Sequence, residues 1–325
     1  MTDRPEISVA LATRDRPVRL RWLLNALAEQ TLARERFEVV VANGSTRPET
    51  TRLLAAHPLA RDGVLRHLDV PPAPGPARNR NHCWRAARAP LVLFTDDDCR
   101  PPADWLERAL DAALRHPGAI VQGRTTPDPD EGEIVHACPH ARTQRVDPPT
   151  PFAETCNIAY PREVLERHGG FHEDEPLQAC EDTDLALRAR ESGTDYVGAP
   201  EMLTYHAVDA VSLLHRVRAS GRWGELPWLV KRHPRLRRET YYLRIFWTPI
   251  HLCTALAVAG LTLSLRRRAA LTLVLPWLVA DWPKYGAGVR GLLRSLTELP
   301  GHAAIDLAEL AVLARGSLRY RSLLL

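Results

Sequence analysis

Three adjacent carboxylates in this sequence are placed where they could bind a cation. The stretch LVLFTDDDCRP, residues 91–101, sets Asp96, Asp97 and Asp98 directly after the run LVLFT. Like charges a few Å apart repel, and in a partly buried site this repulsion raises carboxylate pKa values unless a cation offsets it. The cluster therefore implies a metal ion, a bound proton or an arginine nearby, unless it is an acidic turn open to water.

The elements around this cluster predict a sheet that would position it. The run 91–95 reads as a strand buried on both faces, as in a parallel sheet covered by helices. Further strands are predicted at 7–12, 37–42 and 64–68, with helices from Pro17 and over 49–56 and 77–87. Such alternation with short links predicts an α/β fold, Rossmann-like, with a mostly parallel central sheet flanked by helices. Carboxylates just past a strand's carboxyl end lie where open α/β sheets bind ligands.

Glycine patterns and composition narrow the class of protein. No G-x-G-x-x-G follows an early strand and no G-x-x-x-x-G-K-[ST] occurs, which disfavours hydride transfer and P-loop phosphotransfer. The 325 residues, 45% hydrophobic and 25% charged, suit one large domain plus an appendage. The six cysteines are scattered without a C-x-x-C pair, so we expect free thiols in a reducing compartment. The N-terminus lacks a signal-peptide core, and the first domain is expected in the cytosol.

Seven motifs resemble family 2 glycosyltransferases of the GT-A fold, in the same order and at similar spacing. They are ISVALATRDRP, FEVVVANGST, GPARNRN, LVLFTDDDCRP, CNIAYPREVLERHGGFHE, EDTDLALRARESG and PEMLTYH. The resemblance covers roughly residues 5–207. It implies a GT-A catalytic domain that uses a nucleoside-diphosphate sugar as donor substrate.

The resemblance assigns Asp96 and Asp98 to a divalent cation that holds the donor pyrophosphate. Hard oxygen ligands suit Mg²⁺ or Mn²⁺, and alternate residues of an extended segment point to the same side. His206 in PEMLTYH is implied as a third ligand, and an imidazole suits Mn²⁺ better than Mg²⁺. For Asp97, contact with the sugar or ribose and support of the turn both stay open.

The reaction also requires a base that takes the proton of the acceptor hydroxyl. The resemblance places it in EDTD, where we assign Asp182 as the base and Glu181 as the residue that orients acceptor or base. A direct displacement with one base predicts inversion of the anomeric configuration. The structural alternative is that acidic residues are simply favoured in a first helical turn by the helix dipole.

Further contacts are implied on the donor side. Thr13 and Arg14 fall where the family touches the nucleotide, and Arg78 falls where it contacts phosphate or base. Arg16 and Arg80 are interpreted as solvated surface charges, the commoner fate of an arginine.

The usual nucleobase-reading aspartate of the family is absent here. Ala42 and Asn43 occupy its motif, so Asn43 is the candidate substitute, and UDP, GDP and dTDP all stay open. Asn157 is the implied polar contact near the donor sugar and acceptor. Trp105 either stacks on a sugar face or belongs to the core, and its helical spacing from Ala109 favours the core.

Charge divides the chain at about residue 210. Residues 211–325 carry 18 Lys/Arg and 6 Asp/Glu, a balance of +12, whereas residues 1–210 carry 25 and 33, a balance of −8. We predict a catalytic domain over 1–210, a basic helical linker over 211–244, and a hydrophobic hairpin plus amphipathic helix over 245–325. For the basic part we predict an anionic membrane surface as the partner and no nucleic acid.

The stretch 245–265 contains no formally charged residue and approaches the length of a membrane-spanning helix. A single crossing would violate the positive-inside tendency, because basic segments flank the stretch on both sides. A hairpin dipping into one leaflet avoids this conflict, and the C-terminal helix suits the interface. A soluble helical subdomain, packed on the catalytic domain or on a second copy in a homo-oligomer, is the alternative.

These observations predict a metal-dependent, inverting glycosyltransferase on the cytoplasmic face of the cell membrane, peripheral or monotopic. Its acceptor is expected to be a lipid-linked or cell-envelope glycan, and this expectation comes from the membrane segment alone. A natural-product glycosyltransferase, a metal-dependent phosphotransferase and a non-catalytic nucleotide-sugar-binding scaffold are the alternatives.

Overall fold

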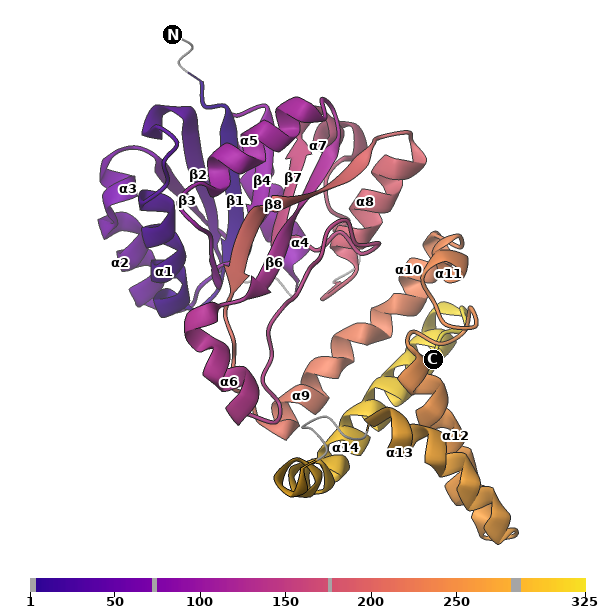
Figure 1. Cartoon of the computed structure of the whole chain (residues 1–325). Helices are drawn as coiled ribbons and strands as arrows, with labels where there is room; N and C mark the ends of the chain where they lie inside the picture. Colours follow the sequence, from indigo (N-terminus) through magenta and orange to yellow (C-terminus); the bar gives the residue numbers. More distant parts are fainter. Residues whose placement is uncertain (1–3, 72–74, 175–176, 282–287) are drawn as a thin grey trace. The chain divides into compact units, whose positions relative to one another are not determined.

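A computed structural model describes residues 4–71, 75–174, 177–281 and 288–325 of the chain (Figure 1). The chain divides into two compact units. Unit 1 comprises Met1–Ala137 and Ala141–Asp209, and unit 2 comprises Cys138–His140 and Ala210–Leu325.

Unit 1 is built on one eight-stranded sheet in the order β3-β2-β1-β4-β7-β6-β8-β5. Its strands are β1 (Ile7–Thr13), β2 (Phe37–Asn43), β3 (Leu65–Asp69), β4 (Leu91–Thr95), β5 (Cys99–Arg100), β6 (Ile120–Pro127), β7 (Asn157–Pro161) and β8 (Tyr196–His206). The strands predicted at the N-terminal end are confirmed and pair in parallel. Because β7 runs antiparallel to both β4 and β6, the α/β sheet is mixed.

Helices cover both faces of this sheet. They are α1 (Pro17–Ala28), α2 (Pro48–Ala56), α3 (Pro58–Arg61), α4 (Pro76–Ala86), α5 (Trp105–Arg115), α6 (Gly132–Ala137), α7 (Arg162–His168) and α8 (Glu181–Glu191). Proline in the first turn of α1, α2 and α4 favours a helix start there, because its missing N–H has no partner to lose.

Alternating side chains of the central strands feed two hydrophobic cores. In β1, Val9 packs in one core with residues of α1 and α5, and Ala10 packs in the other with residues of α4, α7 and α8. This period of two is the pleat of a strand buried on both faces. Because β1 pairs in parallel with β2 and β4, the carboxyl ends of the three strands share one edge of the sheet, and the candidate residues follow there.

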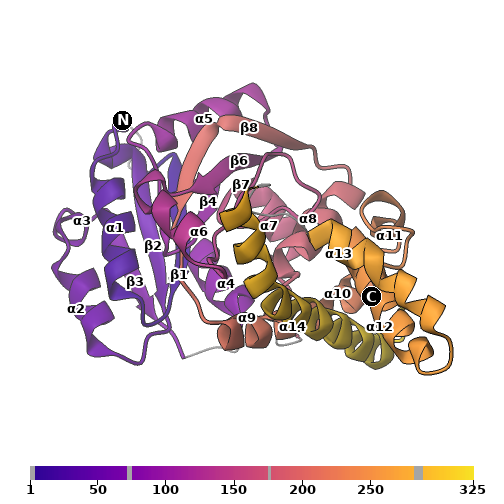
Figure 2. The ribbon, with the colours of Figure 1, turned by 60° about the horizontal axis from the view of Figure 1, so that its bottom comes forward.

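Unit 2 is helical. It contains α9 (Leu213–Ala219), α10 (Leu226–Arg232), α11 (Leu236–Glu239), α12 (Pro249–Ser264), α13 (Leu275–Asp281) and α14 (Val289–Tyr320), with 3-10 turns over Ser220–Glu225 and Arg268–Val274 (Figure 2). Helix α12 takes 16 residues of the apolar stretch 245–265. In the part of the chain that the structure describes, no helix has both the length and the apolarity to cross a bilayer.

Candidate active site

The three aspartates form a tight turn between β4 and β5. The turn closes with a bond from the Cys99 N–H to the Asp96 carbonyl, 3.1 Å. The Thr13 hydroxyl at the end of β1 donates to Asp97 over 2.7 Å. Burial, followed by the charge of Asp98, raises the pKa of Asp97 to about 7, against the lowering effect of Arg16. Asp97 thus lies inside the turn and binds its neighbours, while Asp96 and Asp98 are partly exposed.

Strand β8 brings His206 to this turn. Cys99 pairs with His206 in the β5–β8 ladder, and the Ala207 N–H donates to the Asp98 carbonyl over 2.9 Å. The imidazole Nε2 then lies 3.5 Å from Asp98 Oδ1. Its Nδ1 lies 2.9 Å from the Ala207 carbonyl, which can only accept, so Nδ1 is the donor there and Nε2 is the nitrogen directed at the aspartates.

Asp96, Asp98 and His206 fit a divalent cation. One ligand atom from each lies within 4.8 Å of the other two. Ligands of an octahedral ion at about 2.1 Å are separated by roughly 3–4.2 Å, so only a small closure is needed. The donor set of two carboxylate oxygens and one imidazole nitrogen suits Mn²⁺ and tolerates Mg²⁺.

Two arginines offset part of the negative charge. Arg16 donates to Asp98 Oδ2 over 2.6 Å and lies 3.5 Å from Asp97. Because Asp98 uses Oδ2 for this bond, its Oδ1 remains directed at His206. Arg80, nearly buried, donates to Asp96 over 3.0 Å and to Glu181 over 2.6 Å. The interpretation of both arginines as solvated charges is therefore wrong for Arg80 and incomplete for Arg16, which is half-exposed but paired.

A signal for Arg80 was present in the sequence. Ala77, Arg80, Asn81 and Trp84 repeat at helical spacing along one face of α4, and all four are buried. An arginine on the apolar stripe of a helix under a sheet must pair with carboxylates, because an unpaired charge there would be too costly.

The acidic pair of the EDTD motif begins α8 and lies on the other side of Arg80. Glu181 is buried, and its Oε2 has no hydrogen-bond partner within the described structure. Burial and the charge of Glu181 raise the pKa of Asp182 well above its ordinary value, and the charge of Arg80 opposes this. A carboxylate with a raised pKa is a stronger base, which suits proton abstraction near neutral pH.

The two arginines that the resemblance assigns to the nucleotide, Arg14 and Arg78, lie at the surface. Arg14 is exposed. Arg78 is 60% exposed, with its Nε 3.7 Å from Glu173. Their predicted contacts with the nucleotide stay predictions, and Arg78 does not join the aspartates in the way that Arg80 does.

The two asparagines of the predicted site are committed to internal bonds. Asn43 donates to Thr51 and Asp69, at 2.9 and 2.8 Å, and accepts from the Ser45 N–H. The buried Asn157 donates to the carbonyls of Arg124 and Met202.

Asn157 also accepts a bond from the Trp105 indole, so its amide hydrogens and its carbonyl oxygen are all used within the fold. The structure thus gives Asn157 partners within the fold, and its expected contact with donor or acceptor stays a prediction. Trp105 is fully buried in the core, which excludes sugar stacking.

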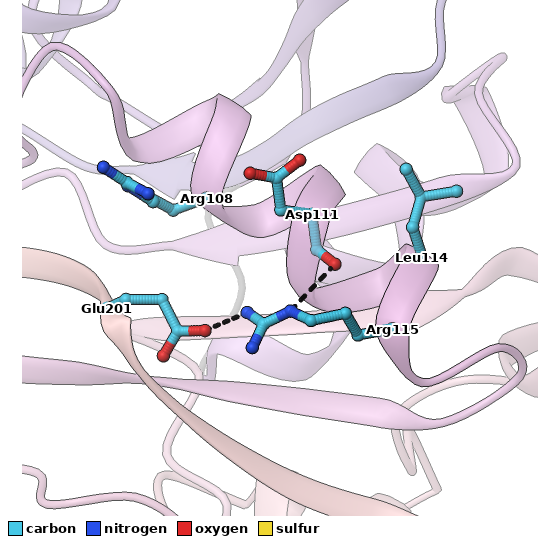
Figure 3. Close-up of a pocket in the computed structure, with 5 residues that line it drawn as sticks. All are labelled: Arg108, Asp111, Leu114, Arg115 and Glu201. Atoms are coloured by element: carbon cyan, nitrogen blue, oxygen red, sulfur yellow. Dashed lines mark hydrogen bonds and ion pairs between the residues drawn. The ribbon is translucent and has the colours of Figure 1, made fainter.

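An open hollow on unit 1 shares no lining residue with the acidic turn, and its lining residues are drawn in Figure 3. It is lined by Arg108, Asp111, Leu114 and Arg115 of α5 and by Glu201 of β8, and Arg115 pairs with Glu201. Its lining includes no histidine, cysteine, serine or threonine, and we assign it no chemistry.

Comparison with known proteins shows which protein family and which enzymes this chain resembles. The family model described as glycosyl transferase family 2 matches residues 8–169. The O-antigen biosynthesis protein RfbC of Myxococcus xanthus is 29% identical over 255 residues, 69% of this chain and 19% of that protein. The validoxylamine A glucosyltransferase of Streptomyces hygroscopicus subsp. jinggangensis is 26% identical over 271 residues, 73% of this chain and 63% of that protein. The chain thus spans about a fifth of the first relative and less than two thirds of the second.

Among solved structures, the chain resembles the mannosyltransferase PcManGT from Pyrobaculum calidifontis, in complex with GDP-Man and Mn²⁺. The two share 20% identity with a TM-score of 0.58, over 98% of this chain and 88% of the other. At this identity the likeness supports the fold, which is of the GT-A type.

Proposed function

This chain belongs to glycosyl transferase family 2 through residues 8–169 and is a glycosyltransferase, and we propose that it is a metal-dependent, inverting one. The observation that carries the proposal is the meeting of Asp96, Asp98 and His206 at the carboxyl edge of the sheet. Asp96 and His206 are 110 residues apart in the sequence, and the pairing of Cys99 with His206 brings β8 to the acidic turn. Two such carboxylates and an imidazole are the ligands for a cation that carries a diphosphate.

Charge supports the same conclusion. The site holds five carboxylates, those of Asp96, Asp97, Asp98, Glu181 and Asp182. Among the described residues, two guanidiniums, those of Arg16 and Arg80, form ion pairs with them. A bound divalent cation would neutralise the remaining charge and, when the sugar departs, the charge that develops on the leaving nucleoside diphosphate.

The protein residues supply the rest of the reaction. Asp182 takes the proton of the acceptor hydroxyl as that oxygen attacks the anomeric carbon, and its raised pKa makes it an effective base. Glu181, fixed through Oε1 by Arg80, orients the neighbouring Asp182 and the acceptor. A single displacement assisted by one base inverts the anomeric configuration.

The donor is a nucleoside-diphosphate sugar. Thr13, Arg14 and Arg78 are proposed to contact the nucleotide, and PcManGT, which binds GDP-Man and Mn²⁺, supports a nucleotide-sugar at this edge of the fold. Asn43 uses both amide hydrogens within the fold, so as a substitute for the missing aspartate it would accept a base N–H through its Oδ1, which also accepts from the Ser45 N–H. The nucleobase therefore stays open, and UDP, GDP and dTDP are all tested below.

For the acceptor we propose a lipid-linked or cell-envelope glycan, with the enzyme at the cytoplasmic face of the membrane, peripheral or monotopic. The relative from Myxococcus xanthus is named for O-antigen biosynthesis, which favours this acceptor. The validoxylamine A glucosyltransferase favours a small natural product as the second candidate. Sugar transfer to a lipid-extractable product supports the first candidate, and transfer only to water-soluble acceptors supports the second.

A thermal-shift screen of UDP, GDP and dTDP, each with and without Mn²⁺, tests the donor site. We expect one nucleotide to stabilise the protein only with metal, by about 2.7 kcal/mol at a hundred times its Kd. Asp98→Asn should abolish this shift, whereas Asp104→Asn, an exposed acid paired with Arg108, should leave it unchanged. Absence of a shift with any nucleotide would contradict the proposed site.

Turnover and stereochemistry test the base. Asp182→Asn should retain the nucleotide-dependent shift and lose about 10²–10⁴-fold in kcat. The anomeric configuration of the product, read by NMR coupling constants, should be opposite to that of the donor. Retention of configuration, or full turnover by Asp182→Asn, would remove Asp182 from this role.

A further inference from the structure

Unit 2 exposes much of its apolar surface. Of the 20 large apolar side chains left exposed in the described residues, 16 lie in this smaller unit, and 10 of these are on α12, α13 and α14. Contiguous exposed apolar surface on this scale marks an interaction site.

Helix α12 has inverted polarity. Its buried residues are His251, Thr254, Ala257 and Gly260, a polar and small stripe at a spacing of three. A Cβ on Gly260 would lie 2.8 Å from the Ala270 carbonyl, so the backbones of α12 and the 268–274 turn approach closely there. A helix on a water-soluble domain buries its apolar side, whereas a lipid-facing helix packs through small and polar residues.

The outward side of this hairpin is apolar. Leu261 and Leu265 of α12 and its end are 56% and 89% exposed, and Leu271 and Leu275 after the turn are 48% and 54% exposed. Helix α13 and the 268–274 turn pack beside α12, so these exposed leucines lie on neighbouring elements (Figure 2). We call Leu261, Leu265, Leu271 and Leu275 the outer apolar face.

Helix α14 also buries polar residues. Its buried residues include Ser295, Glu298 and Ser317 beside Ile305 and Leu313, while Leu293 and Leu318 are exposed. Two of these polar side chains bond within the unit: Glu298 accepts from Arg294 over 2.8 Å, and Ser317 donates to the Leu324 carbonyl over 2.6 Å.

Charge selects the occupant of the outer apolar face. Residues 249–280 contain Arg266, Arg267 and Arg268 and no acidic residue, and all three arginines are exposed beside Leu265. Anionic lipid headgroups complement this arrangement. A second copy on a two-fold axis would place the same arginines against each other, and like charges disfavour that interface.

The geometry also sets the mode of binding. Helix α12 is about 24 Å long at 1.5 Å per residue, short of the roughly 30 Å hydrocarbon core. The arginine triplet lies at the turn of the hairpin, so an end-on dip, as the sequence suggests, would carry it in first, and arginine is costly at that depth.

We propose that unit 2 lies flat in the interface of an anionic membrane. The outer apolar face rests in the acyl boundary and Arg266, Arg267 and Arg268 bind the headgroups. This inference rests on, and deepens, the membrane-proximal location proposed above.

Flotation of the full chain with phosphatidylcholine vesicles, with and without about one third phosphatidylglycerol, tests the inference. We expect flotation with anionic vesicles that weakens with salt. The double variant Leu261→Ser/Leu265→Ser should lower the partition coefficient at least tenfold, and replacing the three arginines by Gln should lower it about a hundredfold. The control is Leu114→Ser, an exposed leucine on unit 1, which should float like the parent.

Three outcomes overturn the inference. The first is equal flotation of all variants, and the second is no flotation of the parent at low salt. The third is a dimer in solution that Leu261→Ser/Leu265→Ser dissociates, which would assign the face to a second copy. The nucleotide-dependent thermal shift is measured on each variant and should be unchanged, so a failure of lipid binding is separated from a failure of the transferase site.

Discussion

Replacement of Arg80 by Met removes the guanidinium that joins the two halves of the acidic site. Arg80 contacts Asp96 at 3.0 Å and Glu181 at 2.6 Å, and its side chain is 10% exposed. Methionine keeps most of the length and the apolar stem, so the variant tests the charge and its bonds rather than the volume.

The expected loss follows from the exposure of the partners. Glu181 is only 4% exposed, and leaving such a carboxylate without its partner costs about 3–5 kcal/mol. Asp96 is 25% exposed, so its lost pair adds little. Arg85→Met on the same helix breaks a half-exposed pair with Glu173 and should cost at most about 1 kcal/mol.

Thermal unfolding of the metal-free chain measures the difference. At roughly 2–4 °C per kcal/mol for a unit of this size, Arg80→Met should lower Tm by about 6–20 °C. Arg80→Met/Glu181→Gln should be more stable than Arg80→Met, because the buried charge is gone together with its partner. Since Arg80 opposes the raised pKa of Asp182, the acid limb of the kcat/KM profile should move to higher pH in Arg80→Met.

The reasoning is refuted if the Tm of Arg80→Met lies within about 1 °C of the Tm of Arg85→Met. A double variant less stable than Arg80→Met would show that Glu181 does not depend on the guanidinium.

Three further predictions concern the turn and the core. Asp97 has a folded pKa of about 7 against an ordinary 3.8, so its contribution to stability is lost as pH rises from about 4 to about 7. Asp97→Asn should therefore flatten the Tm–pH curve of the metal-free chain between these pH values. An unchanged slope would contradict the raised pKa of Asp97. Trp105→Ala should cost about 3–5 kcal/mol by denaturant unfolding, because the indole is fully buried, and a loss under 1 kcal/mol would place it outside the core. Gly170→Ala should cost about 2–4 kcal/mol, since φ is +75° and a Cβ would meet Asn81 and Trp84; Gly169→Ala, at φ +70° with open space, should cost only about 1–2 kcal/mol, and equal losses would exclude the steric part.

The fold was predictable because the apolar runs of β1, β2 and β4 and the proline-initiated helices are local signals. The antiparallel placement of β7 was not, since pairing direction depends on contacts far apart in sequence. The described part of the C-terminal third gave helices as expected, but the apolar stretch 245–265 begins its helix only at Pro249.

The candidate site was predictable where a residue's position in a strand end fixes its direction. His206 follows this rule, because β8 delivers it to Asp98 by backbone register. Arg80 does not, since only its helical face distinguishes it from the exposed Arg78 two residues earlier. Asn157 shows a feature that the sequence could not give: its amide bonds to Trp105 and to two backbone carbonyls far away in the chain.

The register between β5 and β8 also bears on how the chain is made. His206 is synthesised 108 residues after Asp98, a delay of about 5–20 s at ordinary ribosomal speeds. Arg16 and Arg80 both precede the aspartates, so two guanidiniums are already in the nascent chain when the carboxylates appear. The two arginines can therefore balance the acidic turn during translation, before the strand that carries the histidine exists.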